Sequence, residues 1–192
     1  MPPRASAKRA AGPARAWRSI LLASLFTALL PFLATAEPEG PIKAAFLFNF
    51  ARYVEWPAVA FENERAAIRL CVMSEKDFDQ VVSATVSGRR VGSRLVAVEK
   101  VESLAGAEAC HLLFLDESVG GPASMAADRL GELAIFTISD QPGFAVGGGI
   151  ANFILVDQKI RFEINPSAAR RAGLKISSSL LRLAKRVGED GR

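Results

Sequence analysis

The chain has 192 residues, half of them hydrophobic, with 24 Lys and Arg against 20 Asp and Glu. Five of the basic residues and none of the acidic ones lie in residues 1–36, so removing that segment from the 24 and 20 leaves 19 basic against 20 acidic residues. With charges this evenly balanced, the composition shows no excess of basic residues of the kind that binds nucleic acid or anionic lipid. The remaining length is that of one ordinary domain with its own core.

Residues 1–36 have the three parts of a secretory signal peptide: a basic flank, an apolar run over 20–33, and small residues at 34–36. A membrane anchor is the alternative, but the run is interrupted by Pro31 and is shorter than the roughly 20 residues that span a bilayer. We therefore expect cleavage after Ala36. The predicted organisation is a signal peptide at 1–36, a flexible lead at 37–41, one domain at 42–187 and a disordered tail at 188–192.

The first half of the domain alternates helical and strand patterns. Apolar residues at helical spacing predict a helix over 42–56, which Pro57 ends, and its stripe is rich in aromatic side chains. Strands are expected at 68–73 and 95–98, a helix at 77–84, and partly helical structure at 100–108. We expect the aromatic stripe of the first helix to be partly exposed and to provide a surface for self-association.

The second half begins with apolar runs at 110–115 and 134–138, which are typical of strands buried on both faces, with a helix at 121–130 between them. A glycine-rich loop at 140–149 precedes a hairpin, with strands at 150–156 and 159–164 joined by a tight turn at Asp157 and Gln158. Helices are expected from Pro166 to Gly173 and over 179–187. The fold class is therefore α/β, a single domain with a mixed, mostly parallel sheet, helices on both faces and a C-terminal antiparallel hairpin.

Catalytic and metal-binding patterns are sparse in this sequence. The single histidine, His111, begins an apolar strand, and no metal-ligand spacing or nucleophile elbow is present. We therefore expect neither an enzyme, nor a metal, nor a cofactor. The two cysteines, Cys71 and Cys110, are expected to form a disulfide after export.

Two features remain open between a structural and a binding role. Alternation in the strand at 159–164 puts Arg161, Glu163 and Asn165 on one face. That face either meets water or binds a partner or ligand. The glycines at 147–149 precede a strand rather than a helix, so they form either a simple turn or a loop for a ligand or partner.

Four stretches, taken in order, resemble the YfiR-type periplasmic proteins. They cover most of residues 41–187 and comprise 43–50 with 54–57, 109–114, 139–144 with 148–153, and 161–165 with 172–178 and 180–184. The resemblance implies a dimeric periplasmic repressor that binds the periplasmic domain of an inner-membrane diguanylate cyclase. It also implies that an outer-membrane lipoprotein can draw the repressor away.

The resemblance also implies roles for individual residues. Glu163 and Phe153 are the expected partner-binding residues, and Cys71 and Cys110 match a disulfide. A second disulfide of the family lies around the glycine loop, where this chain has Ala145 and Asn152, so at most one bond remains for a redox response. The alternative function is a periplasmic sensor that binds a small molecule near the glycine loop.

Export predicts the N-terminus of the working protein. If residues 1–36 are removed, the chain recovered from the periplasmic fraction begins at Glu37. N-terminal sequencing and intact mass test this. A membrane-retained chain that still carries residues 4–33 would contradict it.

Overall fold

The computed structural model describes residues 39–119, 121 and 123–188, so the predicted signal peptide and its cleavage site lie outside the described residues. The described residues belong to one compact unit. The strands of its main sheet are β2 (Ile68–Met73), β3 (Arg90–Val91), β4 (Arg94–Lys100), β5 (Leu112–Leu115), β6 (Phe136–Ser139), β7 (Ala151–Val156), β8 (Lys159–Ile164) and β10 (Lys185–Arg186). A separate antiparallel pair consists of β1 (Val54–Glu55) and β9 (Lys175–Ile176).

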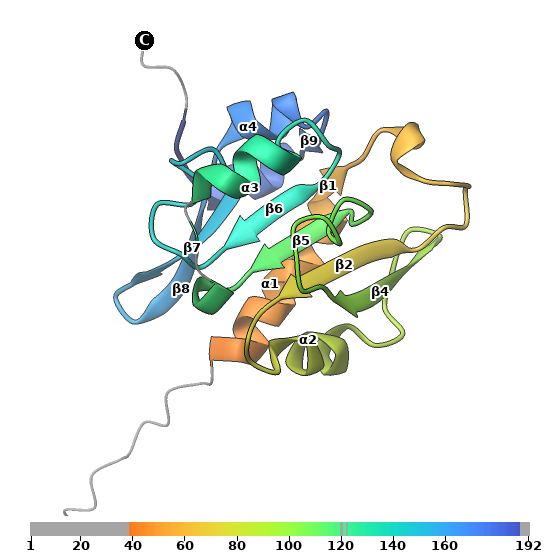
Figure 1. Cartoon of the computed structure of the whole chain (residues 1–192), viewed down its shortest axis with the longest axis horizontal. Coiled ribbons are helices and arrows are strands. Elements are labelled where there is room, and N and C mark those ends of the chain that lie inside the picture. The colour runs from red at the N-terminus through yellow and green to blue at the C-terminus, as the bar shows by residue number, and fades with distance from the viewer. Residues whose placement is uncertain (1–38, 120, 122, 189–192) are drawn as a thin grey trace, which may run out of the picture. The chain divides into compact units, whose positions relative to one another are not determined.

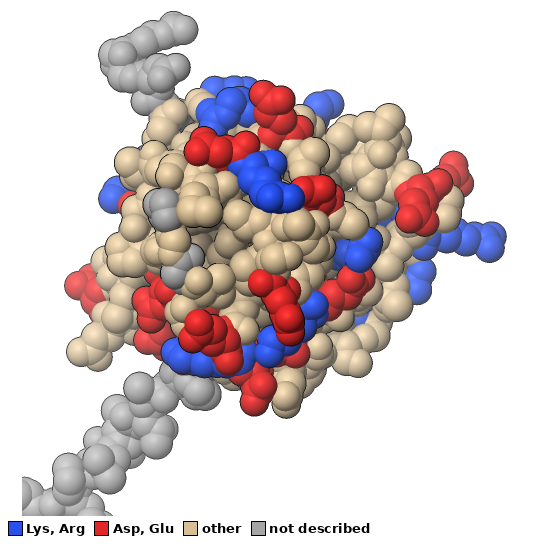
Figure 2. Space-filling view, in the orientation of Figure 1, with Lys and Arg blue, Asp and Glu red and all other residues tan. Residues whose placement is uncertain are grey.

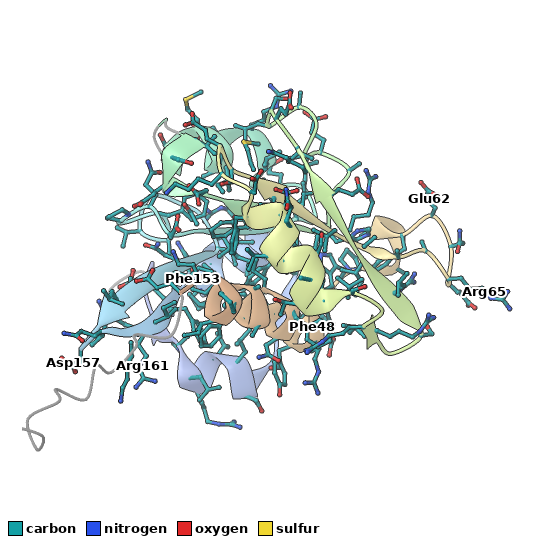
Figure 3. All side chains as sticks on the ribbon, turned by 90° about the horizontal axis from the view of Figure 1, so that it is seen from below. Phe48, Glu62, Arg65, Phe153, Asp157 and Arg161 are labelled. Atoms are coloured by element: carbon teal, nitrogen blue, oxygen red, sulfur yellow. A yellow bond between two sulfur atoms is a disulfide. The ribbon has the colours of Figure 1, made fainter. Side chains whose placement is uncertain are left out.

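The main sheet is mixed and mostly parallel, in the order β10-β8-β7-β6-β5-β2-β4-β3. Only the β7–β8 and β3–β4 pairs are antiparallel. The helices are α1 (Glu39–Tyr53), α2 (Phe78–Val86), α3 (Ala123–Leu130), α4 (Pro166–Arg171) and α5 (Ser178–Leu183), with single 3-10 turns η1 (Ala58–Ala60) and η2 (Glu117–Val119). Helices α1 and α2 lie on one face of the sheet and α3 on the other (Figures 1 and 3). The predicted fold class, including the C-terminal hairpin, is therefore confirmed.

The main core forms where α1 crosses the sheet. Phe50 of α1 is fully buried, and its ring centroid lies 5.1 Å from that of Phe162 and 5.8 Å from that of Phe153. Such ring pairs add packing energy beyond the area that they bury. Two strands at the far end of the sequence therefore pack on the first helix of the domain.

The aromatic surface of α1 is covered rather than exposed. Helix α2 packs beside α1, Phe48 is 8% exposed, and the Arg89 guanidinium lies 4.9 Å from the centroid of its ring. Tyr53 is the only aromatic residue of α1 in the exposed class, at 37%. Less of the stripe is exposed than expected, because a second helix and the sheet cover most of its large aromatic rings; whether this helix takes part in self-association stays a prediction.

A smaller core on the opposite face contains the disulfide. Cys71 of β2 and Cys110, just before β5, are bonded with their Cα atoms 6.0 Å apart. Leu113, Leu130 of α3 and Ile135 pack around them. The predicted disulfide is present, and it joins neighbouring parallel strands.

Several boundaries differ from the expected ones. The first helix ends at Tyr53 rather than at residue 56, because Val54 and Glu55 pair with β9 as β1. Helix α1 already begins at Glu39, so the expected flexible lead overlaps its first turn. Residues 101–109 form turns rather than helix, after β4 continues to Lys100 alongside β2. Helix α5 ends at Leu183, because Ala184 turns to an extended conformation and the chain pairs with β8 as β10.

His111 fixes the loop before β2 to the sheet. It is 6% exposed, its Nδ1 accepts the Arg69 N–H, and its Nε2 lies 3.0 Å from the Ala60 carbonyl oxygen. Its ring stacks on Phe61 at 4.4 Å. Burial lowers the pKa of His111. The hydrogen bond to the Ala60 carbonyl oxygen raises that pKa by a smaller amount, so the pKa stays below its usual value. Both ring nitrogens are occupied, so His111 has a structural role here.

The disulfide closes a separation of 39 residues, which gives a testable contribution to stability. Replacing both Cys71 and Cys110 with alanine should lower the free energy of unfolding by about 2–4 kcal/mol, because the cross-link restricts the unfolded chain. Urea denaturation without reductant measures this. Reductant should bring the wild type toward the variant and leave the variant unchanged; equal stability of the variant and the oxidised wild type would contradict the prediction.

Candidate partner-binding surface

The β7–β8 hairpin projects from the end of the sheet with an apolar tip. Asp157 and Gln158 both have positive φ, at 49° and 58°, as a two-residue turn of the type I′ kind requires. Leu155 and Val156 immediately precede the turn and are 62% and 43% exposed. Figure 3 shows the labelled Asp157 and Arg161 at one end of the molecule, opposite the loop that carries Glu62 and Arg65. The hairpin therefore offers an exposed apolar surface beside charged residues.

Glu163 lies at the base of this hairpin and is nearly buried. It is 7% exposed, and its carboxylate accepts a hydrogen bond of 2.8 Å from the Lys185 ammonium group of β10. Across the hairpin it pairs with Asn152 of β7. Arg161 is exposed, as expected, but Glu163 and Asn165 are not. The strand thus changes from exposed to buried along its length, because β10 and the glycine-rich loop cover its second half.

Phe153, the other expected partner-binding residue, points into the main core. It is 4% exposed, and its ring lies 5.8 Å from Phe50 and 6.1 Å from Phe114. Its side chain is not available at the surface of this conformation. Glu163 and Phe153 therefore shape the base of the hairpin, while Leu155 and Val156 form its surface.

The glycine-rich loop is held by two asparagine side chains. Asn165 donates from Nδ2 to the Ala145 carbonyl oxygen at 2.9 Å and also caps α4 by accepting the Ala168 N–H. Asn152 is fully buried and donates to the carbonyl oxygen of Ser139 at 3.0 Å. Thus Ala145 and Asn152, which lie where the family's second disulfide would be and are not cysteine here, take part in hydrogen bonds that secure the loop.

Gly149 is required where this loop closes. A Cβ atom at Gly149 would overlap the ring of Phe144, which is 1% exposed. The backbone at Gly149 therefore packs directly on the ring of Phe144, which belongs to the same loop. Packing against Phe144 thus gives a structural reason for Gly149, and the binding role of the loop stays a prediction.

A small cavity lies between the hairpin and the start of α1. Its volume is about 190 Å³, and its lining includes Lys43, Asp140, Leu155 and Ile160. The Lys43 ammonium group lies 2.7 Å from the Asp140 carboxylate. Burial by itself lowers the pKa of Lys43, but the Asp140 hydrogen bond and charge outweigh it and raise that pKa. The cavity is thus lined in part by an ion pair.

Within the described ranges, no group of three or more His, Cys, Asp and Glu residues is placed to hold a metal ion. None of the helices in the described part of the chain is long and apolar enough to cross a membrane. Acidic and basic side chains are intermixed over the face shown in Figure 2.

Sequence reasoning missed the residues that define this surface. Lys185 was assigned to a helix, so its ion pair with Glu163 was not expected. The signal for the hairpin tip was nevertheless present, because Leu155 and Val156 are consecutive apolar residues directly before a turn. One of two such residues must face away from the core.

The burial of Glu163 predicts that charge reversal there is costly. Glu163→Lys should lower the free energy of unfolding by about 2–4 kcal/mol, because it would place a second ammonium group against Lys185 in a nearly buried position. The matched control is Arg161→Glu on the exposed part of the same strand, which should change stability by less than about 0.5 kcal/mol. Chemical denaturation compares the two; equal stabilities would contradict the environment described for Glu163.

Two solved structures were found to be similar to the chain, and the first of them supports the fold. The chain is similar to a conserved domain protein from Vibrio cholerae O1 biovar El Tor strain N16961, with a TM-score of 0.50, 10% identity, and coverage of 77% of this chain and 59% of that one. It also matches the ABC domain in complex with L-Trp from Streptococcus pneumonia, with a TM-score of 0.44, 13% identity, and coverage of 64% and 55%. The chain thus spans less than two thirds of either structure's length.

The sequence comparison identifies the family. None of the curated proteins compared with the chain matches it. Residues 41–185, which include both cysteines, the glycine-rich loop, the hairpin and Lys185 of β10, match the YfiR/HmsC-like family. The chain therefore belongs to the YfiR/HmsC-like family.

Proposed function

We propose that this protein is a periplasmic, non-enzymatic regulator of cyclic di-GMP signalling. In this proposal it represses an inner-membrane diguanylate cyclase by binding the periplasmic domain of that enzyme. An outer-membrane lipoprotein would release the cyclase by binding the repressor instead. The observation that carries the proposal is the family match over residues 41–185, together with the signal-peptide pattern of residues 1–36.

The hairpin supports the proposal because a repressor must bind one conformation of its partner better than another. Preference of this kind needs a surface of defined shape. Here the base of the hairpin is fixed by Phe153 in the core and by the Glu163–Lys185 ion pair. The tip then presents Leu155 and Val156 in a defined position. We assign this tip, rather than the buried carboxylate of Glu163, to direct contact with the cyclase.

In this proposal, oxidation and reduction of the Cys71–Cys110 disulfide act by changing the stability of the folded repressor. Cys71 and Cys110 are 0% and 4% exposed and lie in the smaller core, whereas Phe153 and Phe162 of the hairpin belong to the main core. Reduction would remove a cross-link that stabilises the whole domain. It would lower the amount of folded repressor rather than reshape the hairpin.

The alternative, a small-molecule sensor, has one observation in its favour. The cavity beside Lys43 and Asp140 opens next to the hairpin and lies near the carboxyl end of β6, where α/β sheets commonly bind ligands. A purified protein that retains a metabolite would support this alternative. A volume of about 190 Å³ is below the usual range of roughly 300–1,000 Å³ for ligand sites.

Deletion and complementation test the repressor function. Deleting the gene should raise cellular cyclic di-GMP and attachment, and expression of the wild type should reverse both. Leu155→Asp should fail to complement because it places a charge on the apolar tip, while the thermal midpoint should change little at an exposed site. Val59→Asp is the matched control, since Val59 is 91% exposed on the η1 turn, just before the loop with Glu62 and Arg65 that lies opposite the hairpin (Figure 3).

Two outcomes would contradict the proposal. Unchanged cyclic di-GMP after deletion, under oxidising and reducing conditions alike, would rule out the repressor function. Full complementation by a stably expressed Leu155→Asp protein would rule out the hairpin tip as the contact surface.

A further inference from the structure

The charges of the domain are balanced in number but separated along the chain. Residues 39–140 carry ten Lys and Arg against fifteen Asp and Glu, whereas residues 141–188 carry eight against two. All eight of these later basic residues are exposed. Of the two acidic residues, Asp157 is exposed and Glu163 is nearly buried. The C-terminal part of the domain is therefore strongly basic, although the composition as a whole shows no basic excess.

Three of these basic side chains form a row along the β8–β10 edge of the main sheet. Lys159 and Arg161 of β8 are two residues apart, so their side chains point to the same face. Lys185 of β10 lies beside Glu163 in the sheet, with its ammonium group 2.8 Å from the Glu163 carboxylate, and therefore shares that face. Phe162 points to the opposite face, into the main core. The row thus lies on the face of β8 that does not pack on α1.

Further basic side chains lie on the other side of the same edge. Arg186 follows Lys185 in β10, so it points to the opposite face, and it is exposed. Arg182 of α5, a helix that packs on α1 and on β10, is exposed as well. Its guanidinium group donates to the hydroxyls of Ser178 and Ser179, which carry no charge and leave its own charge in place. Basic residues therefore flank the edge on both faces of the sheet.

Apolar side chains accompany the row toward the tip of the hairpin. Val156 pairs with Lys159 and Ile154 with Arg161, and directly paired residues point to the same face of a sheet. Val156 is 43% exposed and Ile154 is half-exposed. Leu155 points to the opposite face, so its substitution and those in the row act on different surfaces. Exposed apolar side chains next to lysine and arginine are the combination by which amphipathic segments bind an anionic bilayer surface.

We propose that the β8–β10 edge binds the surface of a bilayer that contains anionic phospholipid. The basic side chains contact phosphate groups of the lipid headgroups, and the apolar side chains of the hairpin enter the boundary beneath them. Cations that are spread along an edge and flank it on two sides fit many phosphates in a plane better than one anion in a pocket. Such binding would concentrate an exported repressor beside an inner-membrane partner, but it does not depend on the proposed repressor function.

Lys159 and Arg161 are the residues of the row that best test this attraction. The Glu163 carboxylate offsets the charge of Lys185, so Lys159 and Arg161 supply most of the net charge of the row. Each basic residue near an anionic bilayer surface contributes roughly a fivefold gain in affinity. Salt screens this attraction, so binding through the row should weaken as the salt concentration rises.

Co-sedimentation with vesicles tests the proposal on the protein recovered after export of the full chain. The wild type should bind vesicles of phosphatidylcholine mixed with phosphatidylglycerol, and bind far less to phosphatidylcholine alone. The double variant Lys159→Glu, Arg161→Glu should bind the mixed vesicles about tenfold or more weakly. The matched control is Arg65→Glu, Arg90→Glu, which changes the net charge equally at exposed positions opposite the hairpin and on the far edge strand β3 (Figure 3). It should bind as the wild type does.

Three outcomes would overturn the proposal. The wild type may bind both kinds of vesicle equally or neither, or the two double variants may lose binding to the same extent, which would make net charge the cause. Binding of poly-L-glutamate without binding of the mixed vesicles would show instead that the edge fits an acidic protein. Thermal midpoints measured alongside should change little at these exposed sites. Cellular cyclic di-GMP tests the repressor function separately, because vesicle binding by the purified protein needs no cyclase.

Discussion

The packing of α1 against the sheet is the constraint on which the rest of this structure depends. Phe50 contacts strands from the middle and the end of the sequence, including Phe136 of β6 at 5.5 Å and Phe162 of β8 at 5.1 Å. The sheet cannot bury its central strands on this face without α1. The hairpin in turn cannot take its position without the ring contacts that α1 provides.

This packing divides the hairpin into a fixed base and a free tip. Phe153 and Phe162, which pair across β7 and β8, are held in the core, while Leu155 and Val156 at the tip remain exposed. The Glu163–Lys185 pair adds a second constraint on the opposite face of the same strands. A surface of this construction suits recognition of a protein partner, because it is ordered before binding and loses little conformational freedom.

Much of the fold follows from local patterns. The continuous apolar runs around Leu113 and Phe136 predict buried strands, and the turn at Asp157 and Gln158 predicts the hairpin, because these signals depend on neighbouring residues alone. The burial of Glu163 could not be predicted in the same way. It depends on β10, which pairs with β8 across 22 residues, and on side chains of the glycine-rich loop. Similarly, from sequence alone the aromatic stripe of α1 has more apolar surface than one face of a small domain would bury, because the sequence does not show that α2 packs beside it.

The order of the chain has a consequence for how the domain folds. Helix α1 begins the domain, yet Phe153 and Phe162 complete its core, and the Tyr53 carbonyl oxygen accepts a hydrogen bond from Ser177. Contacts between residues so far apart in sequence slow folding, because the entropy lost on closing a long loop precedes the favourable contacts that the closed loop makes. A chain that is exported from its N-terminus would present α1 outside the cytoplasm well before β8. Until the last quarter of the sequence arrives, its phenylalanines would remain uncovered and open to capture by a chaperone or by another unfinished chain.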